Sequence, residues 1–174
     1  MRNHKTIKEM KLTRLFLVLA AVLITLASAC KKDELQVDKD KSVIKKYLKE
    51  NNITAECVSN VHYVVNVEGS GEQCELGDTV AIKYTVKSIK NPTKVIENKS
   101  DIAEIFILPS SRNTKADVLF GLQIALPTMK EGGKTTFYIP SAYAYGSHPI
   151  ADETNANLIY DVELCEIIHR GKVH

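Results

Sequence analysis

The 174-residue sequence contains no tryptophan, only four cysteines and five histidines. The cysteines include no CxxC pair and the histidines no HxxxH pair, so their spacing indicates neither a zinc site nor a dithiol redox site. We therefore expect no metal and no cofactor.

The cysteines also limit disulfide formation. If Cys30 is set aside as a modified residue, Cys57, Cys74 and Cys165 remain, so at most one disulfide can form. Cys57 with Cys74 is the one pairing we consider, and free thiols are the alternative. Cys165 lies in an alternating strand pattern, where a buried free thiol acts as a small apolar side chain.

The first 29 residues differ from all that follow. Five Lys and Arg residues precede the apolar run from Leu15 to Ala29, which ends in small residues and is short for a membrane span. Residues 1–29 are therefore predicted to be a signal peptide. The junction "LASAC" resembles the lipobox of bacterial lipoproteins, which makes Cys30 the predicted lipidation site. A plain secretory signal with a chance cysteine is the alternative.

Most of the positive charge belongs to this leader. The remaining residues carry 18 Lys and Arg against 20 Asp and Glu, a net charge of −2. No basic patch is left to indicate nucleic acid as a partner. About 145 residues suffice for one domain and a tether, but not for two full domains.

The segment after Cys30 is highly charged. Residues 30–41 are predicted to be a solvated tether, and "CKKDE" resembles an export tag of Bacteroidetes surface lipoproteins. Residues 42–57 are predicted to form a short amphipathic helix, over Ser42–Asn51, and a linker, with Asp40 and Ser42 as capping candidates. Its apolar stripe can dock on the following domain or on a partner.

Downstream the apolar period changes from helical to two, which predicts antiparallel strands. One helix is expected over Val118–Met129, shortened or kinked by Pro127 and ended by Gly132 and Gly133. This pattern predicts an α+β domain over residues 58–168, an antiparallel sheet covered by one helix, followed by a loose tail over 169–174. The expected strands cover 61–67, 80–87, 105–108, 134–140 and 157–168.

The loop "IPSAYAYGSHPI", residues 139–150, places Tyr143 and Tyr145 two residues apart. Core packing is the simpler explanation for such residues. A pocket wall is the alternative, since a tyrosine offers an apolar ring and one directed hydroxyl.

Six motifs occur in order: Gly69-x-Gly71; "GDTV" with Tyr84; Phe106; Gly121 with "ALPTMKEGGK"; "IPSAYAYG"; and "LIYDVEL". Together they resemble the FKBP-type peptidyl-prolyl cis/trans isomerases over about residues 60–168. The resemblance implies a five- to six-stranded antiparallel half-barrel wrapped around one short helix, with a substrate pocket between helix and sheet.

The resemblance also implies residue roles. Tyr145 matches the tyrosine whose hydroxyl binds a substrate carbonyl, Leu119 contributes a backbone N–H, and Glu97 supplies a carboxylate near Tyr84. Taken singly, the apolar members of this set would be read as core residues. The implied substrate-binding residues are Tyr84, Ile96, Phe106, Val118, Leu119, Leu122, Tyr145, Ile150 and Tyr160.

Several positions depart from the family pattern. Leu122 stands where the family most often has tryptophan as the pocket floor, Ile96 replaces a phenylalanine, and Glu97 replaces an aspartate. The loop over residues 109–117 is also longer than in the minimal domain. We expect the fold to persist and the isomerase activity to be reduced.

The leading hypothesis is a lipid-anchored isomerase of the cell envelope that assists the folding of exported proteins. Its partners would be proline-containing segments of those proteins and, through Cys30, a membrane. Two alternatives stay open: an FKBP-like binding or chaperone module with little turnover, and an envelope adaptor that presents the helix at residues 42–51 to a partner.

Overall fold

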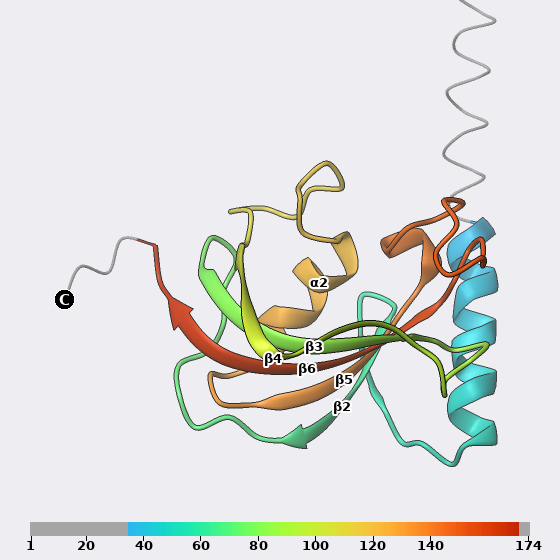
Figure 1. The fold of residues 1–174 in the computed structure, drawn as a ribbon, viewed down its shortest axis with the longest axis horizontal. Coiled ribbons are helices and arrows are strands. Elements are labelled where there is room, and N and C mark those ends of the chain that lie inside the picture. The colour runs from blue at the N-terminus through green and yellow to red at the C-terminus, as the bar shows by residue number, and fades with distance from the viewer. Residues whose placement is uncertain (1–34, 171–174) are drawn as a thin grey trace, which may run out of the picture. The chain divides into compact units, whose positions relative to one another are not determined.

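The computed structural model describes residues 35–170 (Figure 1). The predicted signal peptide, the lipidation site Cys30 and residues 171–174 lie outside the described residues. Residues 35–50 are helical and are called the N-terminal helix below. The elements that follow are β1 Glu56–Val58, β2 Val61–Val67, β3 Thr79–Ser88, β4 Val95–Ile107, α2 Phe120–Ala125, the 3-10 turn η1 Leu126–Thr128, β5 Lys134–Ile139, the 3-10 turn η2 Ser141–Tyr143, and β6 Leu158–Ile168.

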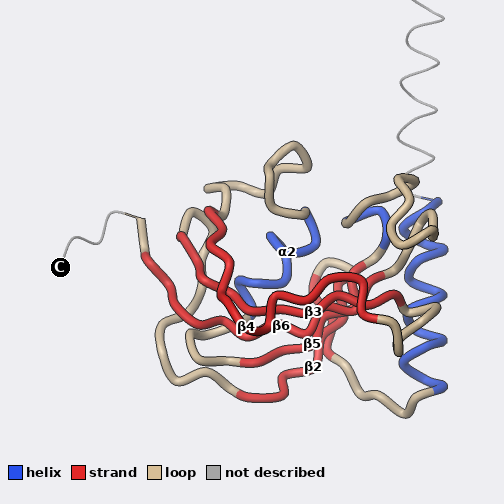
Figure 2. Tube along the Cα trace, in the orientation of Figure 1, coloured by secondary structure: helices blue, strands red, loops and turns tan. Residues whose placement is uncertain are grey.

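The strands form a six-stranded sheet in the order β1-β2-β5-β6-β3-β4, and all neighbours are antiparallel. The sheet curves beneath α2, and its strands come from both halves of the domain (Figures 1 and 2). The predicted fold class, an antiparallel sheet around one short helix with a preceding helix, is confirmed.

The core lies between α2 and the inner face of the sheet. Strand β3 alternates strictly between half-buried and buried residues, because successive side chains of a strand point to opposite faces. Its inward residues, including Val80 and Ile82, pack with Phe137 and Ile139 of β5 and with Leu126. The apolar residues at every second position, from which this strand was predicted, are therefore the residues that pack in the core.

The helix over the sheet is short, as predicted. It ends at Ala125 and continues as the η1 turn, with Pro127 inside the turn. The prediction that Gly132 and Gly133 end it was wrong, because Met129 is already extended. Gly132 instead has φ +80° in the turn before β5, a conformation that favours glycine.

The predicted tether was wrong over its second half. Helical structure already covers residues 35–41, so Asp40 and Ser42 lie inside the N-terminal helix and do not cap its start. Charge content misled the prediction, because Asp40 is buried on the same stripe as Ile44 and Leu48, four and eight residues later.

The N-terminal helix docks on its own domain. Ile44 and Leu48 form a second apolar cluster with Ile89, Tyr138 and Ile159, which lie on the outer face of the sheet. The rings of Tyr47 and Tyr138 add a contact at 6.0 Å between centroids. Of the two alternatives left by the sequence, the structure therefore has the apolar stripe docked on the following domain. No helix among residues 35–170 has the length and apolarity needed to cross a membrane.

The third strand is longer than predicted. Instead of beginning at Ile105, β4 begins at Val95, so Ile96 and Glu97 lie in a strand. Its exposed and half-buried residues hide the alternation, since β4 is at the edge of the sheet and the pairing with β3 shifts register twice.

Two smaller expectations are also decided. The described cysteines are free, which was the alternative to the Cys57–Cys74 pairing: Cys57 is exposed and Cys74 is buried, whereas Cys165, expected to be buried, is half-buried. Burial, with Asp78 and Glu75 nearby, raises the pKa of the Cys74 thiol to about 12. The tail is not loose at its first residue, since His169 Nδ1 lies 2.9 Å from Asp78 Oδ1.

The docked helix predicts a measurable loss of stability on Ile44→Ala. Ile44 is completely buried, so the change should lower the free energy of unfolding by about 2–5 kcal/mol in chemical denaturation. Val43→Ala is the matched control, because Val43 is 46% exposed and should change stability by less than about 0.5 kcal/mol. Equal effects of the two substitutions would contradict the docking.

Candidate functional site

Three aromatic side chains from three adjacent strands meet on the inner face of the sheet. Tyr84 of β3 lies 6.2 Å from Phe106 of β4 and 5.8 Å from Tyr160 of β6, measured between ring centroids. The Tyr84 ring is tilted relative to both neighbours, as aromatic pairs prefer. Tyr84 and Tyr160 are buried, and Phe106 is half-buried. They form an apolar aromatic wall that is open at one side.

A carboxylate stands at the edge of this wall. The Tyr84 hydroxyl donates a hydrogen bond to Glu97 Oε1 at 2.9 Å. Burial, the bond to Glu97 and the charge of Glu97 all raise the pKa of Tyr84, so its hydroxyl stays protonated. The structure thus places Glu97 beside Tyr84, as the resemblance implied, despite its extra methylene.

Tyr145 faces the same group of residues. It is half-buried, and it lies close enough to Tyr160 to affect its ionisation. Burial is the main cause that raises the pKa of Tyr160, and the neighbouring Tyr145 hydroxyl raises it further by charge and hydrogen bonding. Tyr160 therefore acts as a neutral hydroxyl.

The opposite wall comes from the start of α2. Leu119 is the N-cap residue of this helix, and its carbonyl accepts the N–H groups of Leu122 at 2.9 Å and Gln123 at 3.1 Å. Leu122 and Val118 are buried, whereas Leu119 is half-buried. The helix start therefore contributes leucine side chains to the same core cluster as the aromatic wall.

All nine sequence-predicted substrate-binding residues lie in or against the main apolar core, which also contains many residues outside the predicted site. Four of them are buried within it: Tyr84, Val118, Leu122 and Tyr160. Five are half-buried and pack against it: Ile96, Phe106, Leu119, Tyr145 and Ile150. The half-buried members supply apolar surface that a ligand can touch. The roles of these residues in binding stay predictions.

A hollow of about 290 Å³ adjoins the site at Ile96. It lies between the β3–β4 turn and the loop that follows Ile150. Its lining residues are Ser88, Lys90, Asn91, Lys94, Ile96, Ala151, Asp152 and Glu153. Ile96 is the one predicted site residue among them.

Gln123 holds the long loop over residues 109–117 and was missed by the sequence reasoning. It is completely buried in α2. Its side-chain oxygen accepts the Asn113 N–H at 2.7 Å, and its nitrogen donates to the carbonyls of Asn113 at 2.8 Å and Val118 at 2.7 Å. A polar residue within an apolar helix was the only available signal. Gln123 fixes the backbone just before Leu119.

The two tyrosines of the 139–150 loop have different surroundings. Tyr143 packs edge-on against Phe120 at 5.2 Å, and its hydroxyl accepts a hydrogen bond from Asn60 Nδ2 at 3.0 Å. Tyr145 packs against the same core cluster as Tyr143 and lies beside Tyr160. Tyr143 thus packs and anchors the loop, while a role of Tyr145 in a pocket wall stays a prediction.

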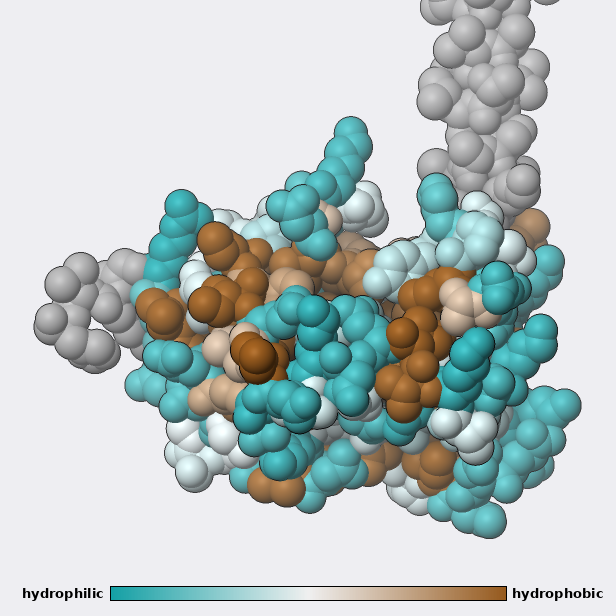
Figure 3. All heavy atoms as spheres, in the orientation of Figure 1, coloured by the Kyte–Doolittle hydropathy of each residue, from teal (hydrophilic) through white to brown (hydrophobic). Residues whose placement is uncertain are grey.

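Apolar residues also reach the surface on edge strand β4. Ile105 and Ile107 are 73% and 68% exposed, and they flank the inward-facing Phe106. Because neighbours along a strand point to opposite faces, they lie on the other side of the sheet and do not line the site. Figure 3 shows apolar surface in separate areas divided by polar ones.

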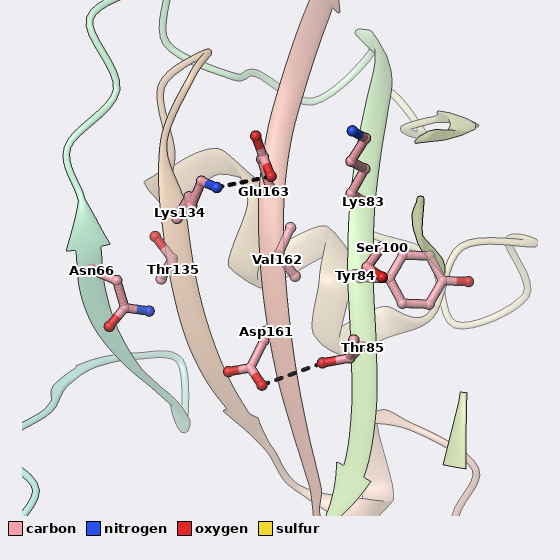
Figure 4. A pocket seen from close by; sticks show the side chains of 10 residues that line it. All are labelled: Asn66, Lys83, Tyr84, Thr85, Ser100, Lys134, Thr135, Asp161, Val162 and Glu163. Atoms are coloured by element: carbon pink, nitrogen blue, oxygen red, sulfur yellow. Dashed lines mark hydrogen bonds and ion pairs between the residues drawn. The ribbon is translucent and has the colours of Figure 1, made fainter. Parts of the chain in front are cut away.

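Another hollow, of about 330 Å³, lies on the outer face of the sheet (Figure 4). Its side chains include Lys83, Thr85, Lys134, Asp161 and Glu163. Lys134 pairs with Glu163 at 3.1 Å, and Thr85 donates to Asp161 at 3.3 Å. Both carboxylates of the hollow, Asp161 and Glu163, thus have partners, which suits a solvated sheet surface.

Asp161 is the centre of this outer network. Lys87 Nζ lies 2.9 Å from its Oδ2, and the Thr136 hydroxyl donates to its Oδ1 at 2.8 Å. Burial alone would raise the pKa of Asp161, but these hydrogen bonds and the charge of Lys87 outweigh it and lower the pKa. Its ionised form therefore stabilises the folded sheet.

The lowered pKa predicts a pH-dependent effect of Asp161→Asn. The stabilisation is present above the unfolded-state pKa, about 3.9, and is lost as pH falls through the lower folded-state pKa. We expect the variant to have a lower Tm than the wild type at pH 7, and the gap to narrow as the pH falls below the unfolded-state pKa of about 3.9. Asp101→Asn, at an exposed position, is the control. A gap that does not depend on pH would contradict the assignment.

Comparisons with known proteins agree with this fold. The family model described as "FKBP-type peptidyl-prolyl cis-trans isomerase" matches residues 70–165. A Neisseria meningitidis protein named "Probable FKBP-type peptidyl-prolyl cis-trans isomerase FkpA" is 28% identical over 153 residues, which are 81% of this chain and 51% of that protein. The chain thus spans about half the length of this relative.

Solved structures share the fold. The crystal structure of FkpA from Escherichia coli is similar with a TM-score of 0.60 and 25% identity, over 91% of this chain and 72% of that one. A peptidyl-prolyl cis-trans isomerase from Pseudomonas syringae also has a TM-score of 0.60, with 18% identity over 77% of this chain and 94% of that one. The latter likeness concerns the fold alone.

Proposed function

Because the chain belongs to the FKBP-type peptidyl-prolyl cis-trans isomerases, we propose that it catalyses the cis/trans isomerisation of X-Pro bonds in polypeptides. The observation that carries the proposal is the aromatic group of Tyr84, Phe106 and Tyr160 on the inner face of the sheet. All nine residues of the family's pocket pattern lie in or against the apolar core that contains this group. The polar contact between Tyr84 and Glu97 at the edge of this cluster supports it.

The reaction suits an apolar site with few polar groups. Rotation about an X-Pro bond crosses a barrier of about 18–20 kcal/mol because the amide resonance is lost on twisting. No covalent bond breaks, so no nucleophile is required. The twisted amide has lost conjugation and much of its dipole, and an apolar, water-poor wall favours it over the planar ground state.

Specific groups then hold the ends of the rotating segment. The Tyr145 hydroxyl donates to a substrate carbonyl, and the backbone N–H of Leu119 binds another. Tyr84, Phe106 and Tyr160 enclose the proline ring. The hollow beyond Ile96 receives the polypeptide chain on one side of the proline, which favours a polypeptide over a small molecule as substrate.

Leucine in place of tryptophan at the floor of the site, Leu122, lowers the catalytic efficiency that we expect. Leu122 is 3% exposed and provides apolar contact without the flat face of an indole. The twisted amide is stabilised mainly by apolar enclosure, so leucine weakens binding while the chemical advantage remains. We propose a measurable but reduced isomerase activity.

The clients are proposed to be exported proteins. The apolar run at residues 15–29 and Cys30 directly after it support a chain that is exported and lipid-anchored in the cell envelope. An X-Pro bond isomerises over tens to hundreds of seconds without a catalyst, which is slow enough to limit folding. An anchored isomerase would accelerate this step for chains that fold nearby.

Tyr145→Phe tests the proposed site. The change removes one hydrogen bond to the substrate, about 0.5–1.5 kcal/mol, so kcat/KM should fall about two- to tenfold in a protease-free assay on a short X-Pro peptide. Tyr63→Phe is the matched control, because it removes the hydroxyl that donates to Glu56 at 2.6 Å on β2, outside the proposed site. Its activity should equal that of the wild type.

The same assay decides between enzyme and binding module. Acceleration above the buffer rate supports the isomerase. If the wild type shows none, but suppresses the aggregation of an unfolded client, the isomerase proposal fails and the binding module takes its place. The docked stripe of the N-terminal helix already weighs against an adaptor that presents this helix, since Ile44 and Leu48 are buried in its own domain.

Cys30→Ser tests the anchor. An acyl chain contributes about 0.8 kcal/mol per buried methylene, so the variant should leave the membrane fraction and stay folded. Fractionation of the host's membranes and mass analysis of Cys30 provide the measurement. An unmodified thiol on Cys30 in the wild-type protein would rule out lipidation.

A further inference from the structure

The segment that carries Tyr145 has little regular structure of its own. Between the end of β5 and Gly146 it contains only the three-residue turn η2, and Ala144 has φ −120° and ψ −112°. Gly146 follows with φ +54°. Such a backbone needs hydrogen bonds from outside to keep one conformation. The position of the Tyr145 hydroxyl depends on those bonds.

Ser141 is the anchor point of this segment. Its carbonyl accepts the N–H groups of Ala144 at 3.0 Å and Gly146 at 2.8 Å, one on each side of Tyr145. Its own N–H donates to Asn157 Oδ1 at 3.1 Å, which ties the turn to the start of β6. Ser141 is completely buried. A shift of Ser141 would move both neighbours of Tyr145.

The N-terminal helix reaches this anchor through Asp40. The carboxylate oxygen Oδ2 accepts the Ser141 hydroxyl at 2.7 Å and the Ala142 N–H at 3.1 Å. Asp40 is 1% exposed and lies about a hundred residues away in sequence. Hydrogen bonds to a carboxylate are short and stronger than those between neutral groups. The helix is thereby hydrogen-bonded to Ser141 and Ala142, which precede Tyr145 in the same segment.

Packing alone does not explain a carboxylate at this position. Ile44 and Leu48 already attach the helix to the sheet through apolar contacts. A buried carboxylate costs free energy unless hydrogen bonds compensate it, and an apolar residue in the same stripe would avoid that cost. What Asp40 adds is a directed contact to the turn before Tyr145.

We infer that Asp40 is a positioning residue that holds the Ser141–Gly146 turn in one conformation. The N-terminal helix, which carries Asp40, thereby helps to position Tyr145 in the active site. The inference rests on the proposed isomerase function for its effect on rate. It implies that the catalytic unit begins within the N-terminal helix, well before the strands of the FKBP-type region.

A double-mutant cycle on the full chain tests the effect on rate. Asp40→Asn should lower kcat/KM about three- to tenfold on a short X-Pro peptide, because the turn loses part of its charge-assisted hydrogen bonding. In a Tyr145→Phe background the same change should cost less than about twofold, since the group it positions is gone. Asp38→Asn, the same change at an exposed position two residues earlier, should leave both rates unchanged.

A purely structural role would give a different result. General destabilisation would lower the rate by the same factor in the wild-type and the Tyr145→Phe backgrounds, and such additivity would overturn the inference. If Asp40→Asn fails to fold, Ser141→Ala takes its place in the cycle, because it removes the hydroxyl that Asp40 binds and leaves the carboxylate.

Amide hydrogen exchange separates this inference from the proposed function. In Asp40→Asn the N–H groups of Ala142, Ala144 and Gly146 should exchange about tenfold faster than in the wild type and in Asp38→Asn. This readout does not need catalysis. A wild type without isomerase activity would refute the proposed function, and faster exchange in Asp40→Asn would still support Asp40 as the residue that holds the turn. Unchanged exchange would overturn the inference.

Discussion

The close approach of α2 to the sheet at Gly121 is the constraint on which the site depends. A Cβ atom at this position would collide with the Ile139 side chain and lie 3.2 Å from the Tyr143 carbonyl oxygen. The absent side chain therefore lets the helix touch both β5 and the segment that carries Tyr145. Leu119 and Leu122, on either side of Gly121, are placed against the aromatic wall as a result. A larger residue would force the two walls of the site apart.

The sheet behind the site is supported on both faces. Along β5, Phe137 and Ile139 point to the core under α2, while Tyr138 between them packs under the N-terminal helix. Tyr160 and Ile159 of β6 divide in the same way. Successive side chains of a strand point to opposite faces, so each of these strands is packed on both sides. The N-terminal helix thus stabilises the strands from which the site is built.

Buried polar residues hold the irregular parts that apolar packing cannot. Gln123 secures the loop before Leu119, and Asn157 and Asp40 secure the turn before Tyr145. Each one satisfies backbone groups or a hydroxyl that would otherwise be buried without a partner. They give single conformations to the loop and turn that present the site. These side-chain hydrogen bonds thereby fix the conformation of the loop and the turn, just as backbone pairing between strands fixes the sheet.

Local patterns in the sequence determined the sheet and the short helix. The alternation in β3 and β6 and the proline after α2 act through neighbouring residues, so the fold class could be predicted without any knowledge of contacts. The order of motifs also gave nine predicted site residues, which the structure has in or against one apolar core. Each motif names a residue type at a fixed place in a known topology, and the strands bring those places together.

Only the tertiary structure showed which groups Asp40 and Gln123 bind and at which residue β4 begins. A charged residue in a charged segment looks solvated until its partners are known, and the donors to Asp40 come from a turn about a hundred residues later. Gln123 likewise depends on a loop backbone that carries no periodic signal. On β4, an edge strand with shifted register, exposed residues interrupt the alternation. In all three places the deciding contacts lie outside the local pattern, which is why residue patterns alone did not reveal them.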